Sequence, residues 1–146
     1  MSMYPAMIEN VARLIEESRE LGVLQIFVRI VSLPGGLSDS PAWIRLRHRL
    51  SIQYGGVEAG DRSTEPIQFG EQGTWGAEIV DKLKVLRDHL VVSKHRSSAF
   101  FRTDLDMLLR SNGRGRVIFT GCTTEGCLES SVRDAELPRL LSDRPQ

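Results

Sequence analysis

The stretch that decides the fold reads Val117-Ile118-Phe119-Thr120-Gly121-Cys122-Thr123-Thr124-Glu125-Gly126-Cys127. Its first three residues are apolar and predict a short buried strand, and residues 121–124 predict a turn. Residues 125–135 predict a helix, whose first turn can be capped by Thr124. This strand-turn-helix order places Cys127 in the first turn of a helix, shortly after the carboxyl end of a strand.

A cysteine at a helix start has two interpretations. The free backbone N–H groups and the helix dipole favour an anion there, and a thiol pKa can fall from ~8.5 to about 3.5–7.5 at such positions. The same N–H groups can stabilise an oxyanion. Alternatively, Cys127 is a small apolar side chain that packs the helix onto the sheet. Position alone favours this second interpretation, because buried and inert cysteines are common.

Upstream of this stretch, helical and strand patterns alternate. Residues 7–21 have the spacing of an amphipathic helix that stops at Gly22, and residues 24–31 predict a buried strand. The further elements expected are helices over residues 41–52 and 77–86, a strand over residues 90–92 that ends at Lys94, and a helix over residues 103–111. This alternation indicates a single α/β domain over residues 1–146 with a parallel sheet.

Active sites of parallel sheets lie at the carboxyl ends of the strands, where both Lys94 and Cys127 fall. A lysine at this place can stabilise a thiolate by Coulomb attraction. The alternative is a lysine that reaches solvent, which is usual for this residue type and is favoured for Lys94 taken alone. The long, Gly-rich and polar segment 55–76 is a loop of the kind that often borders active sites.

Composition and charge exclude several classes of protein. The chain has 19 basic and 19 acidic residues, and a dedicated nucleic-acid binder usually shows a basic excess. No apolar stretch is long enough to span a bilayer. Two cysteines are too few for a disulfide scaffold, and their spacing to the three histidines matches no zinc pattern. We therefore expect a cytoplasmic protein with no nucleic-acid or membrane partner, no metal and no other cofactor.

Two motifs stand at a specific spacing. The first reads Val92-Ser93-Lys94-His95-Arg96-Ser97-Ser98-Ala99-Phe100-Phe101-Arg102-Thr103-Asp104-Leu105. The second reads Gly121-Cys122-Thr123-Thr124-Glu125-Gly126-Cys127-Leu128-Glu129-Ser130-Ser131-Val132-Arg133-Asp134-Ala135. Together they resemble the lysine strand with its S-A-F-x-x-T-x-L segment, and the G-x-x-T-x-x-C-V-x-x-T-x-x-D-A nucleophile motif, of the isochorismatase-like cysteine hydrolases. The resemblance runs from about Met7 to Ala135 and points to the amidase-like branch.

The resemblance implies a three-layer, parallel-sheet, Rossmann-like fold and a mechanism. Cys127 would attack the carbon of a small amide or ureido compound, an aspartate would take the thiol proton, and Lys94 would hold the pair. The backbone N–H groups of Thr123 and Cys127 would form the oxyanion hole, after a cis peptide between Cys122 and Thr123. The resemblance also implies a small-molecule substrate and allows a homo-oligomer. The side chains it suggests as pocket walls are Phe100 and Trp75.

The sequence departs from the family pattern at both ends. The family aspartate closes a first strand in a D-x-Q context, and no aspartate of this chain lies in such a context. Beyond Asp134 and Ala135 the family continues into another strand and helix. We therefore expect a fold without the first strand and without the C-terminal strand and helix. The alternative function is a non-catalytic, truncated paralogue that acts in binding or in oligomer formation.

Overall fold

The computed structural model describes residues 5–45, 49 and 70–136. The chain forms two compact units, which are described separately: the first combines residues 1–29 and 79–146, and the second spans residues 30–78. Both Lys94 and Cys127 belong to the first unit. The expectation of one domain over residues 1–146 stays a prediction.

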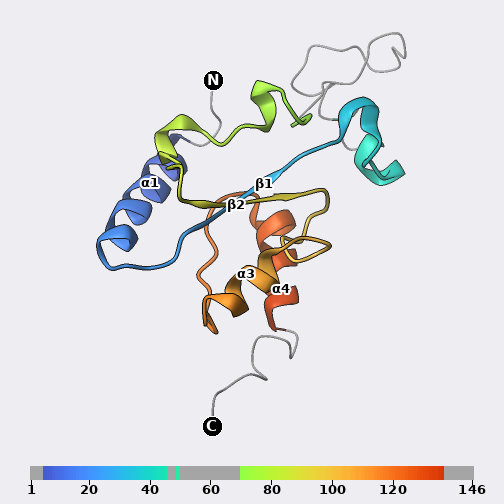
Figure 1. The fold of residues 1–146 in the computed structure, drawn as a ribbon. Helices are drawn as coiled ribbons and strands as arrows, with labels where there is room; N and C mark the ends of the chain where they lie inside the picture. The colour runs from blue at the N-terminus through green and yellow to red at the C-terminus, as the bar shows by residue number, and fades with distance from the viewer. Residues whose placement is uncertain (1–4, 46–48, 50–69, 137–146) are drawn as a thin grey trace. The chain divides into compact units, whose positions relative to one another are not determined.

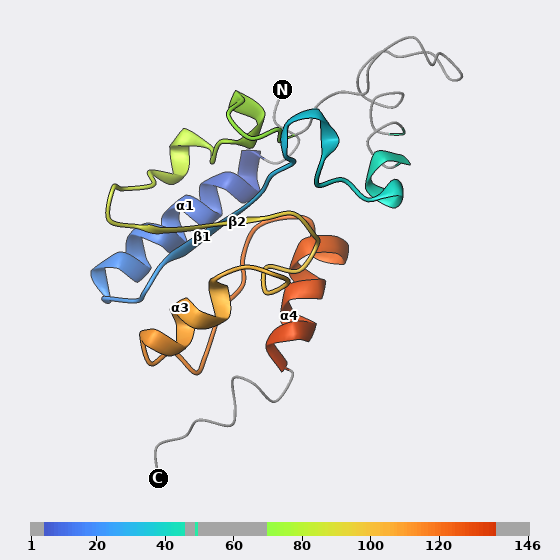
Figure 2. The same cartoon turned by 45° about the vertical axis from the view of Figure 1, so that its right-hand side comes forward.

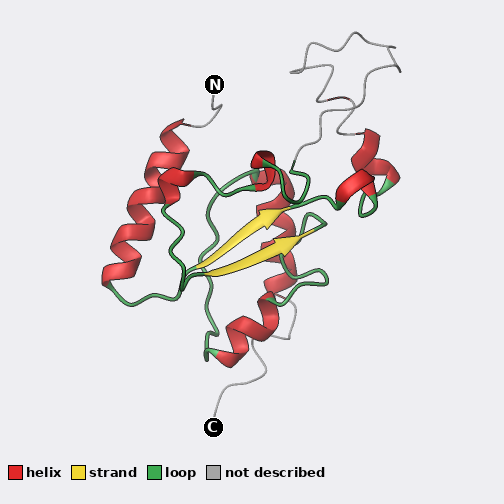
Figure 3. Cartoon of the chain, turned by 45° about the horizontal axis from the view of Figure 1, so that its top comes forward, coloured by secondary structure: helices red, strands yellow, loops and turns green. Residues whose placement is uncertain are grey.

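Two strands and three α-helices build the first unit. Strands β1 (Ile26–Ile30) and β2 (Leu90–Lys94) pair side by side in parallel (Figure 3). Helix α1 (Pro5–Glu20) lies on one side of the strands, and helices α3 (Leu105–Ser111) and α4 (Glu129–Glu136) lie on the other (Figures 1 and 2). This arrangement confirms the predicted α/β class with a parallel sheet. None of the described helices is long and apolar enough to cross a membrane.

The alternation of side chains along β2 orients the unit's core. Val92 and Lys94 are buried while Val91 and Ser93 are exposed, because successive side chains of a strand point to opposite faces. Val92 forms a buried apolar cluster with Ala99, Leu105 and Leu109. Since Leu105 and Leu109 are four residues apart, they share one face of α3. Lys94 therefore projects from the same face of the sheet as the core residue Val92.

Polar contacts connect helix α1 to the rest of the first unit. Gln25 Nε2 donates hydrogen bonds to the Ile15 carbonyl and to Ser18 Oγ at 2.5 and 2.7 Å. Lys82 lies in η3, the 3-10 turn Asp81–Leu83, and its Nζ is 2.9 Å from Glu9 Oε1. That ion pair is exposed and contributes little to stability, since solvent screens it.

Three predicted elements differ in the structure. The strand expected over residues 24–31 shortens to β1, which is half-buried, with Phe27 buried against the His89 ring and Val28 38% exposed. The helix expected over residues 77–86 is wrong, because the extended backbone of Glu78 separates two 3-10 turns, Trp75–Ala77 and Asp81–Leu83. Of the helix expected over residues 41–52, residues 41–45 are helical. Most of its remainder, and most of loop 55–76, lie outside the described residues.

The buried strand expected at Val117–Phe119 is also wrong. Val117 and Phe119 are half-buried, but Ile118 between them is 84% exposed. This alternation is typical of a strand with one buried face. No backbone hydrogen bond joins residues 117–120 to another strand within the described parts of the chain. The segment therefore has the side-chain pattern of a strand without the ladder that defines one.

In the second unit, a short β-bridge joins two segments of the chain. Ser32 N–H donates to the Gly70 carbonyl at 2.8 Å, and Gln72 N–H donates to the Ser32 carbonyl at 2.8 Å. Gly70 has a φ of +69°, and a Cβ there would lie 3.0 Å from the Ile30 carbonyl oxygen. Both the backbone conformation and the close approach therefore require glycine at this position.

Truncating the core at Leu109 tests this packing. Leu109 is 4% exposed, so we expect Leu109→Ala to lower the free energy of unfolding by ~2–5 kcal/mol through lost burial and a residual cavity. Met107→Ala on the same helix is the matched control, because Met107 is 56% exposed and should change stability by ~0.5 kcal/mol or less. Urea titrations followed by circular dichroism measure both variants. Equal midpoints for the two would contradict the assigned core.

Candidate active site around Lys94 and Cys127

Lys94 is the last residue of β2 and is only 4% exposed. A buried ammonium is costly unless its N–H groups are hydrogen-bonded. Its Nζ donates to the carbonyls of Arg96 and Ser97 at 2.8 and 2.7 Å, and to Cys127 Sγ at 3.1 Å. These three acceptors match the three protons of the ammonium. The lysine thus turns inward, and the structure brings it together with Cys127.

The turn after β2 supplies the two carbonyls that hold Lys94. Ser98 is buried, and its Oγ accepts the Phe100 N–H at 3.1 Å. Thr103 Oγ1 donates to the Ala99 carbonyl. The turn is therefore fastened by its own side chains, so the carbonyl oxygens that face Nζ are fixed in place.

Cys127 lies in the first turn of a helical run that begins at Thr124. This turn is a π turn, η4 (Thr124–Leu128), in which the Leu128 N–H donates to the Thr123 carbonyl at 3.2 Å, and α4 follows without a break. The helix expected over residues 125–135 is thus confirmed. The cap expected from Thr124 is wrong: Thr124 is already inside the helix, and extended Thr123 precedes it without a side-chain capping bond.

The backbone before Cys127 has the cis peptide that the resemblance implies, between Cys122 and Thr123. The Thr123 N–H donates no hydrogen bond to any described residue, so it is available to an incoming acceptor. A Cβ at Gly126 would lie 2.8 Å from Thr123 Oγ1, so a side chain there would displace the threonine hydroxyl. The assignment of the Thr123 and Cys127 N–H groups to an oxyanion hole stays a prediction.

Cys127 lies near a second thiol, that of Cys122, as well as near the Lys94 ammonium. Within the described residues, no ion pair involves Lys94. Cys122 is exposed as a residue, yet its thiol is partly desolvated, and this raises its pKa; the nearby Cys127 raises that pKa further. No cluster of three or more His, Cys, Asp or Glu side chains able to hold a metal occurs in the described ranges.

The two predicted pocket walls lie in different places. Phe100 is half-buried, packs against the apolar cluster of Val92, and meets the Phe119 ring edge-on with centroids 6.3 Å apart. Trp75 belongs to the second unit, in the 3-10 turn Trp75–Ala77, and is 91% exposed. Their roles as walls of a substrate pocket stay predictions.

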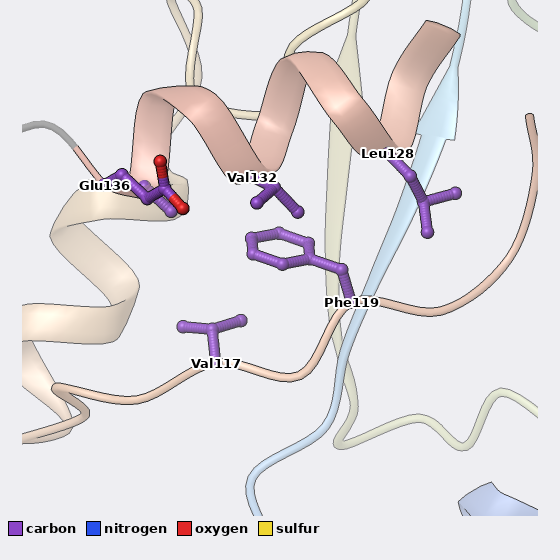
Figure 4. Close-up of a pocket in the computed structure, with 6 residues that line it drawn as sticks. Val117, Phe119, Leu128, Val132 and Glu136 are labelled. Carbon is purple, nitrogen blue, oxygen red and sulfur yellow. The ribbon is translucent and has the colours of Figure 1, made fainter. Parts of the chain in front are cut away.

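An open cavity of about 420 Å³ lies beside α4 (Figure 4). The Phe119 ring lies between Val117 and Val132 there, and Glu136 adds the one carboxylate of its lining. The full lining comprises Val117, Phe119, Leu128, Val132, Ala135 and Glu136. Neither Lys94 nor Cys127 lines the cavity, so the cavity is separate from the Lys94–Cys127 contact.

Ser131 is the residue that the sequence analysis missed. It is 3% exposed, and its Oγ donates to the Cys127 carbonyl at 2.6 Å and accepts the Ala99 N–H at 2.9 Å. The spacing could have revealed the first bond, because a helical serine can donate to the carbonyl four residues before it. The second bond joins residues 32 apart, and no local pattern predicts it.

Comparison with known proteins identifies the lineage. The ureidoacrylate amidohydrolase RutB of Variovorax paradoxus (strain S110) is 32% identical over 132 residues, which cover 88% of this chain and 50% of that protein. RutB of Yersinia enterocolitica is 31% identical over 134 residues, with 87% and 54% covered. The chain thus spans about half the length of the curated relatives it matches.

Solved structures with a similar fold were also found. An isochorismatase family protein from Desulfovibrio vulgaris matches with a TM-score of 0.72 and 26% identity, covering 90% of this chain and 60% of that one. N-carbamoylsarcosine amidase from Thermoplasma acidophilum matches with a TM-score of 0.63 and 24% identity, covering 92% and 65%, and supports the fold alone. The Isochorismatase domain model matches residues 1–137. Since this match takes in almost the whole sequence, the chain belongs to the isochorismatase family.

Proposed function

We propose that this chain hydrolyses a C–N bond of a small amide or ureido compound, with Cys127 as the nucleophile and Lys94 as its charge partner. The observation that carries the proposal is the 3.1 Å contact between buried Lys94 Nζ and Cys127 Sγ. The name of the curated relatives, ureidoacrylate amidohydrolase, supports the same bond type.

The proposed mechanism uses the Cys127 sulfur as a thiolate beside the Lys94 ammonium. A buried ammonium is strongly stabilised by an adjacent negative charge, and the other two acceptors of Lys94 are neutral carbonyls. The thiolate is the reactive form of cysteine. Lys94 therefore stabilises the negative sulfur by Coulomb attraction, while the thiol proton passes to solvent.

The chemistry follows in two steps. The thiolate sulfur bonds to the substrate carbonyl carbon, and the oxygen that becomes negative is stabilised by the N–H groups of Thr123 and Cys127. The C–N bond then breaks, the leaving nitrogen takes a proton from water, and a thioester on Cys127 remains. Water cleaves the thioester and restores the thiolate. No described carboxylate contacts Lys94, and a positioned general base is worth ~10²–10⁴-fold, so we expect slow turnover.

The two cysteines provide a matched test of the nucleophile. We expect Cys127→Ser to abolish ammonia release from a panel of ureido and carbamoyl compounds, because a hydroxyl without a base is a much weaker nucleophile than a thiolate. Cys122→Ser should retain the wild-type rate, since Cys122 makes no hydrogen bond to Lys94. Coupled ammonia assays, with circular dichroism to verify folding, measure both. Equal turnover by Cys127→Ser would rule out the proposed nucleophile.

The pH dependence of Cys122 reports on the charge at Cys127. The Cys122 pKa is raised first by desolvation and second by Cys127. Removing the neighbouring negative charge in Cys127→Ser should therefore lower the Cys122 pKa toward its ordinary value. We expect the alkylation of Cys122 by iodoacetamide to accelerate at a lower pH in this variant than in the wild type. Superimposable profiles would argue that Cys127 carries no charge in the range tested.

A second candidate is a non-catalytic chain that associates with a second copy or with a homologue. The observation that favours it is segment 117–120, which makes no backbone hydrogen bonds to a described strand and in which Ile118 is 84% exposed. Exposed apolar residues on an unpaired extended segment promote pairing with another chain.

Charge insertion at Ile118 tests the association. We expect the wild type to sediment as a concentration-dependent oligomer and Ile118→Lys to sediment as a monomer, because a lysine at an edge blocks pairing. Leu21→Lys is the control, since Leu21 is 80% exposed at the end of α1 and should leave the oligomer intact. Analytical ultracentrifugation measures all three. A monomeric wild type would exclude this candidate.

A further inference from the structure

Buried polar side chains of the first unit lie in or near the Lys94–Cys127 pair. Within the described residues of this unit they are Lys94, Ser98 and Ser131. Lys94 ends β2, and Ser98 belongs to the turn that follows it. Ser131 comes from α4, four residues after Cys127. A buried hydroxyl is expensive unless it is hydrogen-bonded, so its partners indicate what it holds in place.

The Ser131 hydroxyl joins two segments that are far apart in the sequence. It donates to the Cys127 carbonyl at 2.6 Å and accepts the Ala99 N–H at 2.9 Å. Ala99 follows the two carbonyls, of Arg96 and Ser97, that hold the Lys94 ammonium. A closed circuit therefore runs from Cys127 Sγ to Lys94, through the turn to Ala99, and through Ser131 back to Cys127.

We propose that Ser131 is a positioning residue that sets the contact between Lys94 and Cys127. It touches neither Sγ nor Nζ, and it acts by holding the turn that fixes Lys94 against the residue that carries the thiol. This inference rests on the Lys94–Cys127 pair of the proposed function. A purely local helical serine would need the bond to Cys127 alone. The bond to Ala99 is the one that couples the turn to the helix.

The reactivity of the Cys127 thiol can be measured without any substrate, and it reports on the coupling between the turn and the helix. We would measure the rate of Cys127 alkylation by iodoacetamide at neutral pH, by peptide mass, with Cys122 as the internal reference. Ser131→Ala should slow Cys127 about fivefold, the effect of one lost hydrogen bond. Ser131→Thr keeps the hydroxyl and should restore most of the rate. Ser130→Ala is the matched control, because Ser130 lies next to Ser131 on α4 and should leave the rate unchanged.

A double-mutant cycle separates positioning from a merely structural role. In a Lys94→Met background the ammonium is absent, so adding Ser131→Ala should change the Cys127 rate by less than about twofold. An equal slowing in both backgrounds, or a normal rate in Ser131→Ala with its fold intact, would overturn the proposal. Circular dichroism and thermal melting verify folding of each variant. Because the readout needs no turnover, loss of the proposed hydrolysis and loss of the coupling are recorded independently.

Discussion

The first unit is arranged around one costly feature, an ammonium group removed from water. Lys94 is 4% exposed and holds three acceptors within hydrogen-bond distance. The desolvation of a cation is recovered only when geometry and partners are both good. The alternation of β2 turns the lysine inward, the following turn presents two carbonyls, and the π turn presents the sulfur. If a side chain that points to solvent replaced Lys94, the two carbonyls and the sulfur would lose the ammonium that they contact.

The proposed reactivity of Cys127 depends on this constraint more than on its own helix. Two of the lysine's partners are neutral oxygens, and the sulfur is the partner that can carry a full negative charge. In the proposed mechanism, this arrangement activates the thiol through its proximity to the Lys94 ammonium. It also makes reactivity depend on the exact placement of the turn between β2 and α3, since that turn positions the ammonium.

The structural elements that a short sequence pattern determines could be predicted from the sequence. The 3.6-residue spacing of α1, the apolar run of β2 and the nucleophile motif each led to the observed element. The failures occurred where long-range contacts decide. Val117–Phe119 has the composition of a strand, but a strand exists only beside a partner, which sequence periodicity does not specify. Likewise Ser131 was missed because its decisive bond reaches Ala99, 32 residues away.

Two adjacent stripes of side chains run along the helix that begins with the π turn η4 and continues as α4. Cys127 and Ser131 form one stripe against the turn after β2, while Leu128, Val132 and Ala135 form the next stripe along the apolar cavity. Consecutive helical residues are separated by about 100° around the axis. Deleting one of residues 124–126 would therefore shift every following side chain by one helical position, so that Leu128 would take the place of Cys127 beside the ammonium and Cys127 would take the place of Gly126. The length of this single turn thus decides whether the helix presents a sulfur atom or an apolar side chain to Lys94.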